Sequence, residues 1–276
     1  NMSAIKNKMT ELDGDVSYIG LPTSVIHSLN FDQEVSRSAI GQPIGSFYAY
    51  KEDGLFQSEA EIKSYTNNKG ELLQPNAKPG DIKFVDVNGD GVIDGNDRDY
   101  IGNPLPDVTA GLTLGVNFHN FDLSLFFQGM FGNDVYDLTR YVGDFYNQSQ
   151  YNKNSRVVNA WTPTNTNTDI PRVTMDDPNN NIRPSSYYVQ DASFVRLKNM
   201  KIGYSVPQSI LSKIKFNSLY IYAQATNLFT ITGYDGIDPE VGLQSYSSDY
   251  RNLDMGVDRG IYPLSRTFTF GVNVSF

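Results

Sequence analysis

The sequence predicts an all-β fold of antiparallel strands, on the evidence of its composition and its alternation. Tyr (18) and Phe (16) account for most of the aromatic residues, and Gly (23) and Pro (13) are common in this chain of 276 residues. Aromatic residues favour strands, while glycine and proline favour turns. Several segments also alternate strictly between apolar and polar residues, and this pattern is typical of strands with two chemically different faces.

The clearest alternating segment is the C-terminus, residues 266–276. A second segment, 111–118, is joined to a third, 121–128, by only the two residues His119 and Asn120. Two alternating runs with a two-residue link predict a β-hairpin. The apolar face of the C-terminal strand consists of Phe268, Phe270, Val272, Val274 and Phe276.

A longer segment, 194–206, changes phase in its middle. Its apolar positions run in one phase as far as Leu197 and continue in the other phase from Met200. One inserted residue produces such a switch, so we expect a β-bulge near Lys198.

A compact connection, one more strand and a short helix complete the prediction. Residues 207–217 form a compact connection with room for one helical turn, and 219–229 is the next strand. Ser58 and Glu61 have the spacing of a capping box, which predicts a short helix from Ser58 to about Thr66. Five strands are clear, and Ser3–Met9 and Ile44–Tyr50 would raise the number to seven.

Long polar stretches separate these strands. They cover about 52–107, 132–193 and 232–265, whereas the links at 119–120 and 207–216 are short. Loops beyond about 12–15 residues are uncommon in compact domains unless they are functional. Short and long connections alternate along the chain, which is typical of a barrel with short turns on one rim and long loops on the other.

Two environments remain open for the apolar strand faces. The net charge of −9 argues against nucleic acid as the main partner, because phosphate binding needs clustered cations. Apolar runs are too short for a membrane-spanning helix. The apolar faces extend over about ten residues, the length that a tilted strand needs to cross a bilayer, and aromatic residues lie at the strand ends. A soluble β-sandwich would also alternate, so the pattern alone does not decide.

Particular segments of the chain resemble one family. The segment Asn227–Glu240, with its Asn-Leu-Phe-Thr start and Asp-Pro-Glu end, resembles a signature of TonB-dependent outer-membrane transporters. The segments 41–50, 80–94 and 101–107 are similar to those of the SusC/RagA class of Bacteroidota. The terminal Phe276 also matches the aromatic end of barrels that are inserted into the outer membrane.

The resemblance implies a fold and a function. Residues 1–276 would be the C-terminal section of a 22-stranded transmembrane β-barrel with long extracellular loops, and the plug, the TonB box and the signal peptide would lie outside it. Such a transporter imports oligosaccharides or oligopeptides with a SusD-like lipoprotein, and TonB supplies the energy. The alternative is a secreted, soluble calcium-binding β-domain, such as an adhesin or a glycan-binding module.

An acidic segment within residues 80–107 predicts a metal site. Residues 86–97 fit a twelve-residue calcium loop, with Gly91 at the sixth position, where the turn is sharp. The competing interpretation is a solvated acidic turn whose side chains accept hydrogen bonds from its own backbone. The expected oxygen ligands of a structural Ca²⁺ are Asp86, Asn88, Asp90, the carbonyl of Val92, Asp94 and Asp97.

Aromatic residues in the long loops are candidates for substrate contact. Trp161 is the single tryptophan, and Tyr187 and Tyr188 form a pair in the same loop. An indole or phenol ring can stack on a ligand, but it can equally anchor a packed loop. The chain has two histidines and no motif of a known catalytic class, so we predict no catalytic residue and no enzyme activity.

Overall fold

The computed structural model describes residues 1–20, 33–147, 152–214, 216–242 and 253–276. Its main sheet is antiparallel, in the order β1-β8-β9-β12-β13-β16, and β14 also pairs with β12. No helix in the described part of the chain has the length and apolar character that crossing a bilayer requires. The strands are β1 (Met2–Ala4), β8 (Val108–Phe118), β9 (Phe121–Phe131), β12 (Phe194–Ser205), β13 (Ser218–Thr226), β14 (Thr230–Thr232) and β16 (Thr267–Ser275).

The register of this sheet confirms the predicted alternation. β8 and β9 form the expected hairpin around His119 and Asn120, and His119 adopts a positive φ of 54° in the turn. Apolar side chains of neighbouring strands fall in the same rows, because paired residues face the same side of a sheet. One such row runs Phe270, Ala223, Ile202, Leu123 and Val116.

The predicted phase switch in β12 is also confirmed. The register between β12 and β9 shifts between Leu197 and Asn199, so Lys198 is the inserted residue of a β-bulge. Asn227, with φ of 51°, turns the chain beside this bulge and donates its backbone N–H to the Lys198 carbonyl at 3.0 Å. β13 therefore pairs with β12 after the bulge, at residues 199–205, and β14 pairs with β12 before the bulge, at residues 194–196.

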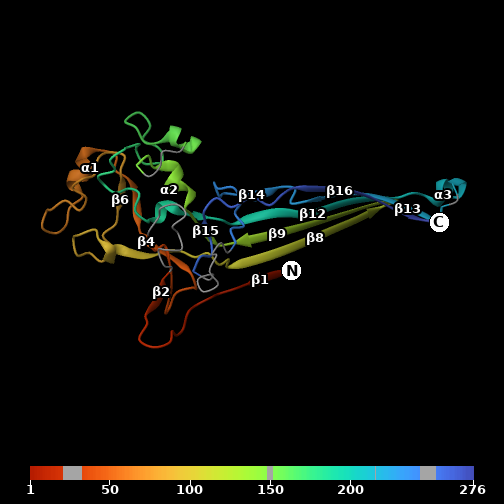
Figure 1. The fold of residues 1–276 in the computed structure, drawn as a ribbon, viewed down its shortest axis with the longest axis horizontal. Helices are drawn as coiled ribbons and strands as arrows, with labels where there is room; N and C mark the ends of the chain where they lie inside the picture. The colour runs from red at the N-terminus through yellow and green to blue at the C-terminus, as the bar shows by residue number, and fades with distance from the viewer. Residues whose placement is uncertain (21–32, 148–151, 215, 243–252) are drawn as a thin grey trace.

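Long and short connections lie at opposite ends of the main sheet (Figure 1). The short end holds the β8–β9 turn and α3 (Gln208–Ile214), which is the predicted compact connection. The other end holds the described parts of three excursions, 5–107, 132–193 and 233–266. The predicted loop 232–265 falls partly outside the described residues.

The excursions fold into small sheets of their own rather than open loops. A four-stranded sheet has the order β2-β3-β4-β7, β5 pairs with β6, and β10 lies between β11 and β15. The predicted short helix is α1, with Ser58 as its N-cap. The elements are β2 (Tyr18–Gly20), β3 (Ser36–Ala39), β4 (Ser46–Tyr50), β5 (Glu52–Leu55), α1 (Glu59–Ser64), β6 (Ile82–Phe84), η2 (Gly95–Asp97), β7 (Arg98–Gly102), β10 (Asp134–Asp137), α2 (Thr139–Asp144), η3 (Ser155–Asn159), η4 (Ser186–Tyr188), β11 (Val189–Asp191) and β15 (Val257–Asp258).

Two strand predictions need correction. The predicted strand Ile44–Tyr50 exists as β4, but it belongs to the four-stranded sheet and not to the main sheet. Of the predicted strand Ser3–Met9, only Ser3 and Ala4 are strand, as part of β1, which pairs with β8. The first excursion therefore begins after Ala4 rather than near residue 52. A short alternating segment has the same pattern in either sheet, which is why the sequence did not separate them.

The main hydrophobic core lies among the excursions. It joins residues from distant segments, including Phe47, Ile82, Tyr136 and Leu253, all of them buried. Buried amide side chains also connect the first two excursions, since the Asn181 Oδ1 accepts from Ile82 N at 2.8 Å and its Nδ2 donates to Asp81 Oδ1 at 2.9 Å. The loop end is thus a packed body, and the main sheet projects from it (Figure 1).

Candidate functional site

One face of the main sheet exposes large apolar side chains over several strands. Phe270 is 80% exposed, Phe268 62% and Val116 57%. Exposed contiguous apolar surface of this extent marks contact with a partner or with a membrane. Further exposed members of this face, which we call the apolar face, are Leu112, Leu114, Phe118, Phe121, Ile202, Ile221, Val272 and Val274.

The opposite face of the sheet is polar. At the end of the sheet near the excursions, it carries the buried guanidinium of Arg196. Arg196 on β12 is only 2% exposed and is enclosed by three acceptors. Its guanidinium donates to Asp238 at 2.6 Å, to Glu240 at 2.8 Å and to Thr230 at 2.7 Å. The Asp-Pro-Glu end of the segment 227–240 is therefore held over the polar face of the sheet.

The acidic loop forms a closed turn in which carboxylates accept from backbone amides. Asp86 accepts from Gly89 N at 2.8 Å and from Gly91 N at 2.9 Å, and Gly91 has φ of 90°. Buried Asp97 accepts from Val87 N at 2.9 Å and from Asp94 N at 2.7 Å. These contacts follow the interpretation of a turn held by its own side chains.

The remaining predicted ligands of the acidic loop point to similar local partners. Asp90 accepts from Val92 N at 2.9 Å, and Asp94 caps the 3₁₀ helix η2 by accepting from Asn96 N at 2.8 Å. Asn88 and Asp90 are exposed. Within the described residues, no three histidine, aspartate or glutamate side chains lie close enough together to hold an ion. The side chains of residues 86–97 supply many oxygen atoms, but these atoms do not point to one common position. A metal ion in this loop therefore stays a prediction.

The three aromatic candidates for substrate contact lie in the core. Trp161 packs its ring against Gly80, whose added Cβ would lie 2.4 Å from Trp161 Cε3, and the indole donates to Gln57 Oε1 at 3.0 Å. Tyr187 and Tyr188 stack edge to face with centroids 5.4 Å apart, and both are buried. Exposed rings for ligand stacking are thus absent at these three positions, and the loop-anchor interpretation describes their placement.

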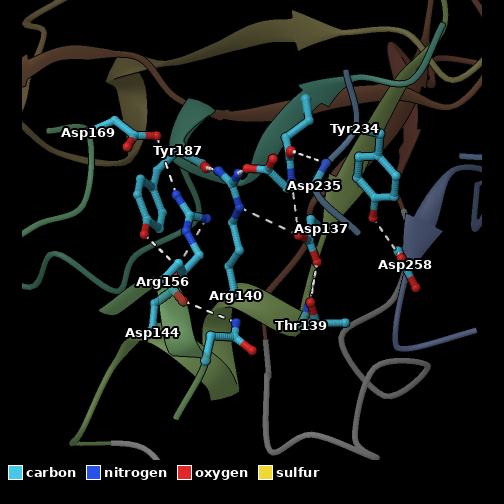
Figure 2. A network of polar contacts seen from close by, with 12 residues as sticks. Asp137, Thr139, Arg140, Asp144, Arg156, Asp169, Tyr187, Tyr234, Asp235 and Asp258 are labelled. Carbon is cyan, nitrogen blue, oxygen red and sulfur yellow. Dashed lines mark hydrogen bonds and ion pairs between the residues drawn. The ribbon is translucent and has the colours of Figure 1, made fainter. Parts of the chain in front are cut away.

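Tyr187 nevertheless borders a network of charged groups, which sequence reasoning missed (Figure 2). Its hydroxyl donates to Asp144 Oδ2 at 2.6 Å, and two arginines flank its ring. The guanidinium carbon of Arg140 lies 5.4 Å from the ring centroid, and that of Arg156 lies 6.0 Å away. Both cations therefore lie near the same aromatic ring.

Each of these arginines has one inner and one outer carboxylate. Arg140 pairs with buried Asp137 at 3.5 Å and with Asp235 at 3.2 Å, and Asp235 has a side chain that is 64% exposed. Arg156 pairs with buried Asp144 at 3.4 Å and with Asp169 at 3.3 Å, and Asp169 is 74% exposed. Figure 2 shows Asp144 below Tyr187, Asp137 to the right of Arg140, and the outer carboxylates Asp169 and Asp235 above the two arginines.

Two adjoining cavities open at this network, and they share Arg140 and Asp235. The first has a volume of about 500 Å³ and the second about 350 Å³, which is within the range of small-molecule sites. The first is lined by Asp137, Thr139, Arg140, Asn154, Ser155, Arg156, Asp235, Gly236, Ile237 and Asp258. The second is lined by Glu52, Arg140, Asp169, Ser186, Tyr187, Val189, Gln190, Asp191, Gly233 and Asp235.

Burial changes the acidity of the groups around the cavities. Burial and the nearby Asp169 carboxylate raise the pKa of Glu52 to about 7. Burial also raises the pKa of Asp137, although hydrogen bonds from Thr139 and the charge of Arg140 act in the opposite direction. Perturbed acids in a cavity are a feature of functional sites, and here they accompany the arginine pair.

No family model matches the chain, but individual proteins do. TonB-dependent receptor P3 of Formosa agariphila is 37% identical over 277 residues, which cover 100% of this chain and 26% of that receptor. TonB-dependent receptor P26 of the same organism is 34% identical, again over the full chain and 26% of the receptor. TonB-dependent receptor SusC of Bacteroides thetaiotaomicron is 27% identical over 281 residues, 100% of this chain and 24% of SusC.

The fold is shared with solved structures of the RagAB peptide transporter. One of them has a TM-score of 0.66 at 22% identity and covers 97% of this chain and 25% of that chain. The chain spans about a quarter of the length of these relatives. The antiparallel sheet, the excursions and the segment 227–240 all lie within the matched region. Along its full length, the chain is therefore similar to about a quarter of several TonB-dependent receptors, SusC among them, and it shares its fold with the matching part of RagAB.

Proposed function

We propose that this chain is the C-terminal section of an outer-membrane, TonB-dependent importer of oligosaccharides or oligopeptides. The whole protein would be a 22-stranded barrel with a plug, and a SusD-like surface lipoprotein would hold substrate against its outer loops. TonB would supply energy through parts outside this section. The relatives and the shared fold support import in general, and the apolar face supports a membrane setting.

The observation that carries the proposal is the combination of the apolar face with unpaired sheet edges. In the described part of the chain, β1 and β16 each have one neighbour in the main sheet. Open edges are not stable in lipid, because each unpaired backbone group costs several kcal/mol there. Strands from the rest of the transporter are therefore the partners that β1 and β16 need, and outer-membrane lipid covers the apolar face.

The alternative is the secreted calcium-binding β-domain. A soluble domain would have to cover Phe270, Phe268 and Val116, and the described residues leave these side chains exposed. We therefore favour the transporter. The two classes differ in a direct observation, since a transporter needs detergent for extraction whereas a soluble module does not.

Fractionation and uptake test the proposal in the whole protein. We expect the full-length protein in the outer-membrane fraction, and we expect growth on its substrate to require both this protein and TonB. A protein recovered in the soluble fraction without detergent would contradict import and would favour the secreted domain.

A structural Ca²⁺ in the acidic loop is a second part of the proposal. The spacing of residues 86–97 and their oxygen-rich side chains support it, with Asp86, Asn88, Asp90, the Val92 carbonyl, Asp94 and Asp97 as ligands. Binding would require the carboxylates to turn from their amide partners toward one ion. Its role would be to fix the loop and not to hold substrate, because these residues already supply about six ligands.

Chelation tests this metal prediction. A chelator should increase protease cleavage within residues 80–100 of the whole transporter while leaving the barrel folded, and Asp90→Ala should have the same local effect. Asp99→Ala, an exposed carboxylate just outside the loop, serves as the matched control. If the chelator leaves cleavage unchanged, the loop is a turn held by its own hydrogen bonds, to which Asp90 contributes by accepting from Val92 N.

A further inference from the structure

Arg140 and Arg156 have more N–H groups than the described residues accept. Each guanidinium has five N–H donors. Their hydrogen bonds go to the Tyr187 carbonyl at 2.7 Å, to Asp235 at 3.2 Å and to Asp169 at 3.3 Å. Arg140 Nε and Arg156 Nη1 face the buried carboxylates of Asp137 at 3.5 Å and Asp144 at 3.4 Å without hydrogen-bond geometry. The donors that a ligand's oxygens can reach are therefore those that contact the exposed carboxylates of Asp235 and Asp169.

The inner and outer partners of the two arginines differ in how easily they can be replaced. Asp137 and Asp144 have side chains that are 4% and 0% exposed, and they stay with the cations. Asp235 and Asp169 are mostly in water, where an ion pair contributes little to stability. A ligand carboxylate could take the place of an outer aspartate at small cost, while the inner pairs keep both guanidinium groups oriented.

The first cavity gives a ligand access to this pair. Asp235 and Ile237, which is 61% exposed, lie among its lining residues, so it opens to solvent. Ile237 precedes Asp238, which Arg196 holds over the polar face of the main sheet. The first cavity consequently lies near the end of the polar face that adjoins the excursions. In the proposed barrel, this face would line the interior, where substrate passes.

The lining of the first cavity favours a peptide over a sugar. No aromatic side chain lines it among the described residues, so a sugar ring finds no stacking surface there. Asp137 and Asp258 lie beside the arginines in the same lining, so groups of both charge signs are present. A peptide carries N–H donors for such carboxylates and a terminal carboxylate for the arginines. Paired, bidentate bonds of a carboxylate to arginine are among the stronger hydrogen bonds.

We propose that Arg140 and Arg156 form a subsite that binds a carboxylate group of an oligopeptide, with Asp235 and Asp169 as the groups it displaces. This inference rests on the import function proposed above and narrows its substrate to peptides. It assigns Tyr187 a supporting role, because its ring lies beside both arginines and its hydroxyl donates to Asp144, the inner partner of Arg156.

The test uses the whole transporter, purified in detergent together with any lipoprotein that accompanies it. The protein is incubated with a tryptic digest of casein, either untreated or with its carboxyl groups converted to amides, and retained peptides are quantified by mass spectrometry. We expect at least about tenfold more retention from the untreated digest, because amides lose the charge-assisted bonds to arginine.

Variants separate this subsite from general damage to the protein. Arg156→Gln should reduce retention of the untreated digest about tenfold, whereas Arg183→Gln, which changes an arginine outside both cavity linings, should leave it unchanged. Asp169→Asn and Asp235→Asn remove the competing carboxylates and should increase retention severalfold. Misfolding would raise retention of both digests alike, so an increase confined to the untreated digest makes these two variants the sharper test.

Three results would overturn the proposal. The first is equal retention of the untreated and the amidated digest, and the second is equal retention by Arg156→Gln and Arg183→Gln. The third is retention of oligogalacturonate that depends on Arg156 in the same way, because this would assign the site to acidic sugars. A transporter that is in the outer membrane and imports with TonB but gives any of these results would still have the proposed function. Absence from the outer membrane would instead contradict import itself.

Discussion

Arg196 explains at the residue scale what the segment 227–240 does. The arginine is buried on β12, and the end of that segment supplies Asp238 and Glu240 to it. Removing one member of a buried ion pair leaves the other charge without compensation, which costs about 3–5 kcal/mol. The Asp-Pro-Glu end of the segment is therefore a clamp that holds the third excursion to the sheet.

Arg196→Met should therefore destabilise the whole transporter by roughly 3–5 kcal/mol, because buried Asp238 would lose its cation and Glu240 would keep only Lys198. Lys198→Met is the matched control, since Lys198 shares Glu240 but has a side chain that is 21% exposed, and it should cost less than about 1 kcal/mol. Urea titration of the detergent-solubilised protein, followed by the shift of the folded band in gels, measures both. Similar midpoints for the two variants would show that Arg196 is not a clamp.

Glu52 makes a second residue-scale prediction, on pH. Its pKa in the folded protein is about 7, above the ordinary value of 4.5. A folded-state pKa above the unfolded one means that the carboxyl group favours the folded state at low pH. That contribution is lost as the pH rises from about 4.5 to about 7, and the loss is complete above the folded-state pKa.

Glu52→Gln cannot ionise and should therefore protect the excursions at pH 8 but not at pH 5. The expected gain at pH 8 is roughly 1–2 kcal/mol of local stability, since part of the side chain remains in water. Limited proteolysis of the whole transporter at the two pH values measures the gain. Glu59→Gln on the exposed surface of α1 is the control, and equal protection at both pH values would refute the assignment.

At the scale of elements, the two faces of β8 give a direct test of the membrane setting. Leu114 belongs to the apolar face, and its neighbour Thr113 points to the other face. Leu114→Arg should destabilise the barrel by roughly 2–4 kcal/mol, the cost of arginine near the middle of a bilayer. Thr113→Arg should cost much less. The same urea titration compares them, and equal costs would refute the facing of the strand.

Local patterns account for the elements that the sequence predicted well. Three features depend only on residues that are close in the sequence, so they can be predicted from a single sequence. They are the alternation of β16, the hairpin of β8 and β9, and the bulge at Lys198. The strand Ile44–Tyr50 was placed in the wrong sheet, because its partners, β3 and β7, are set by the tertiary fold.

The charged network was beyond sequence reasoning for a related reason. Tyr187 meets Asp144 across 43 positions of the chain, and Arg140 meets Asp235 across 95. Nothing near Arg140 or Arg156 in the sequence distinguishes them from other loop arginines. The only sequence signal for this network was the cluster of aromatic residues around Tyr187. In the structure, these residues form part of the hydrophobic core and not an exposed binding surface.

At the scale of the whole molecule, the separation of long and short connections predicts the orientation. The core of the excursions joins segments that are far apart in the sequence, such as Phe47, Tyr136 and Leu253. In the proposed barrel, a body of this size is expected outside the cell, because such barrels have short turns on the periplasmic rim. The β8–β9 turn and α3 are then periplasmic.

A protease site inserted on each side of the membrane tests this orientation. The exposed turn between Thr162 and Asn165 is one position, and exposed Ser212 in α3 is the other. Protease added to intact cells should cut the first insertion and leave the second intact, and permeabilising the outer membrane should make the second accessible. Cleavage only at the α3 insertion in intact cells would reverse the arrangement, and it would also remove the arginine cavities from the side that substrate reaches first.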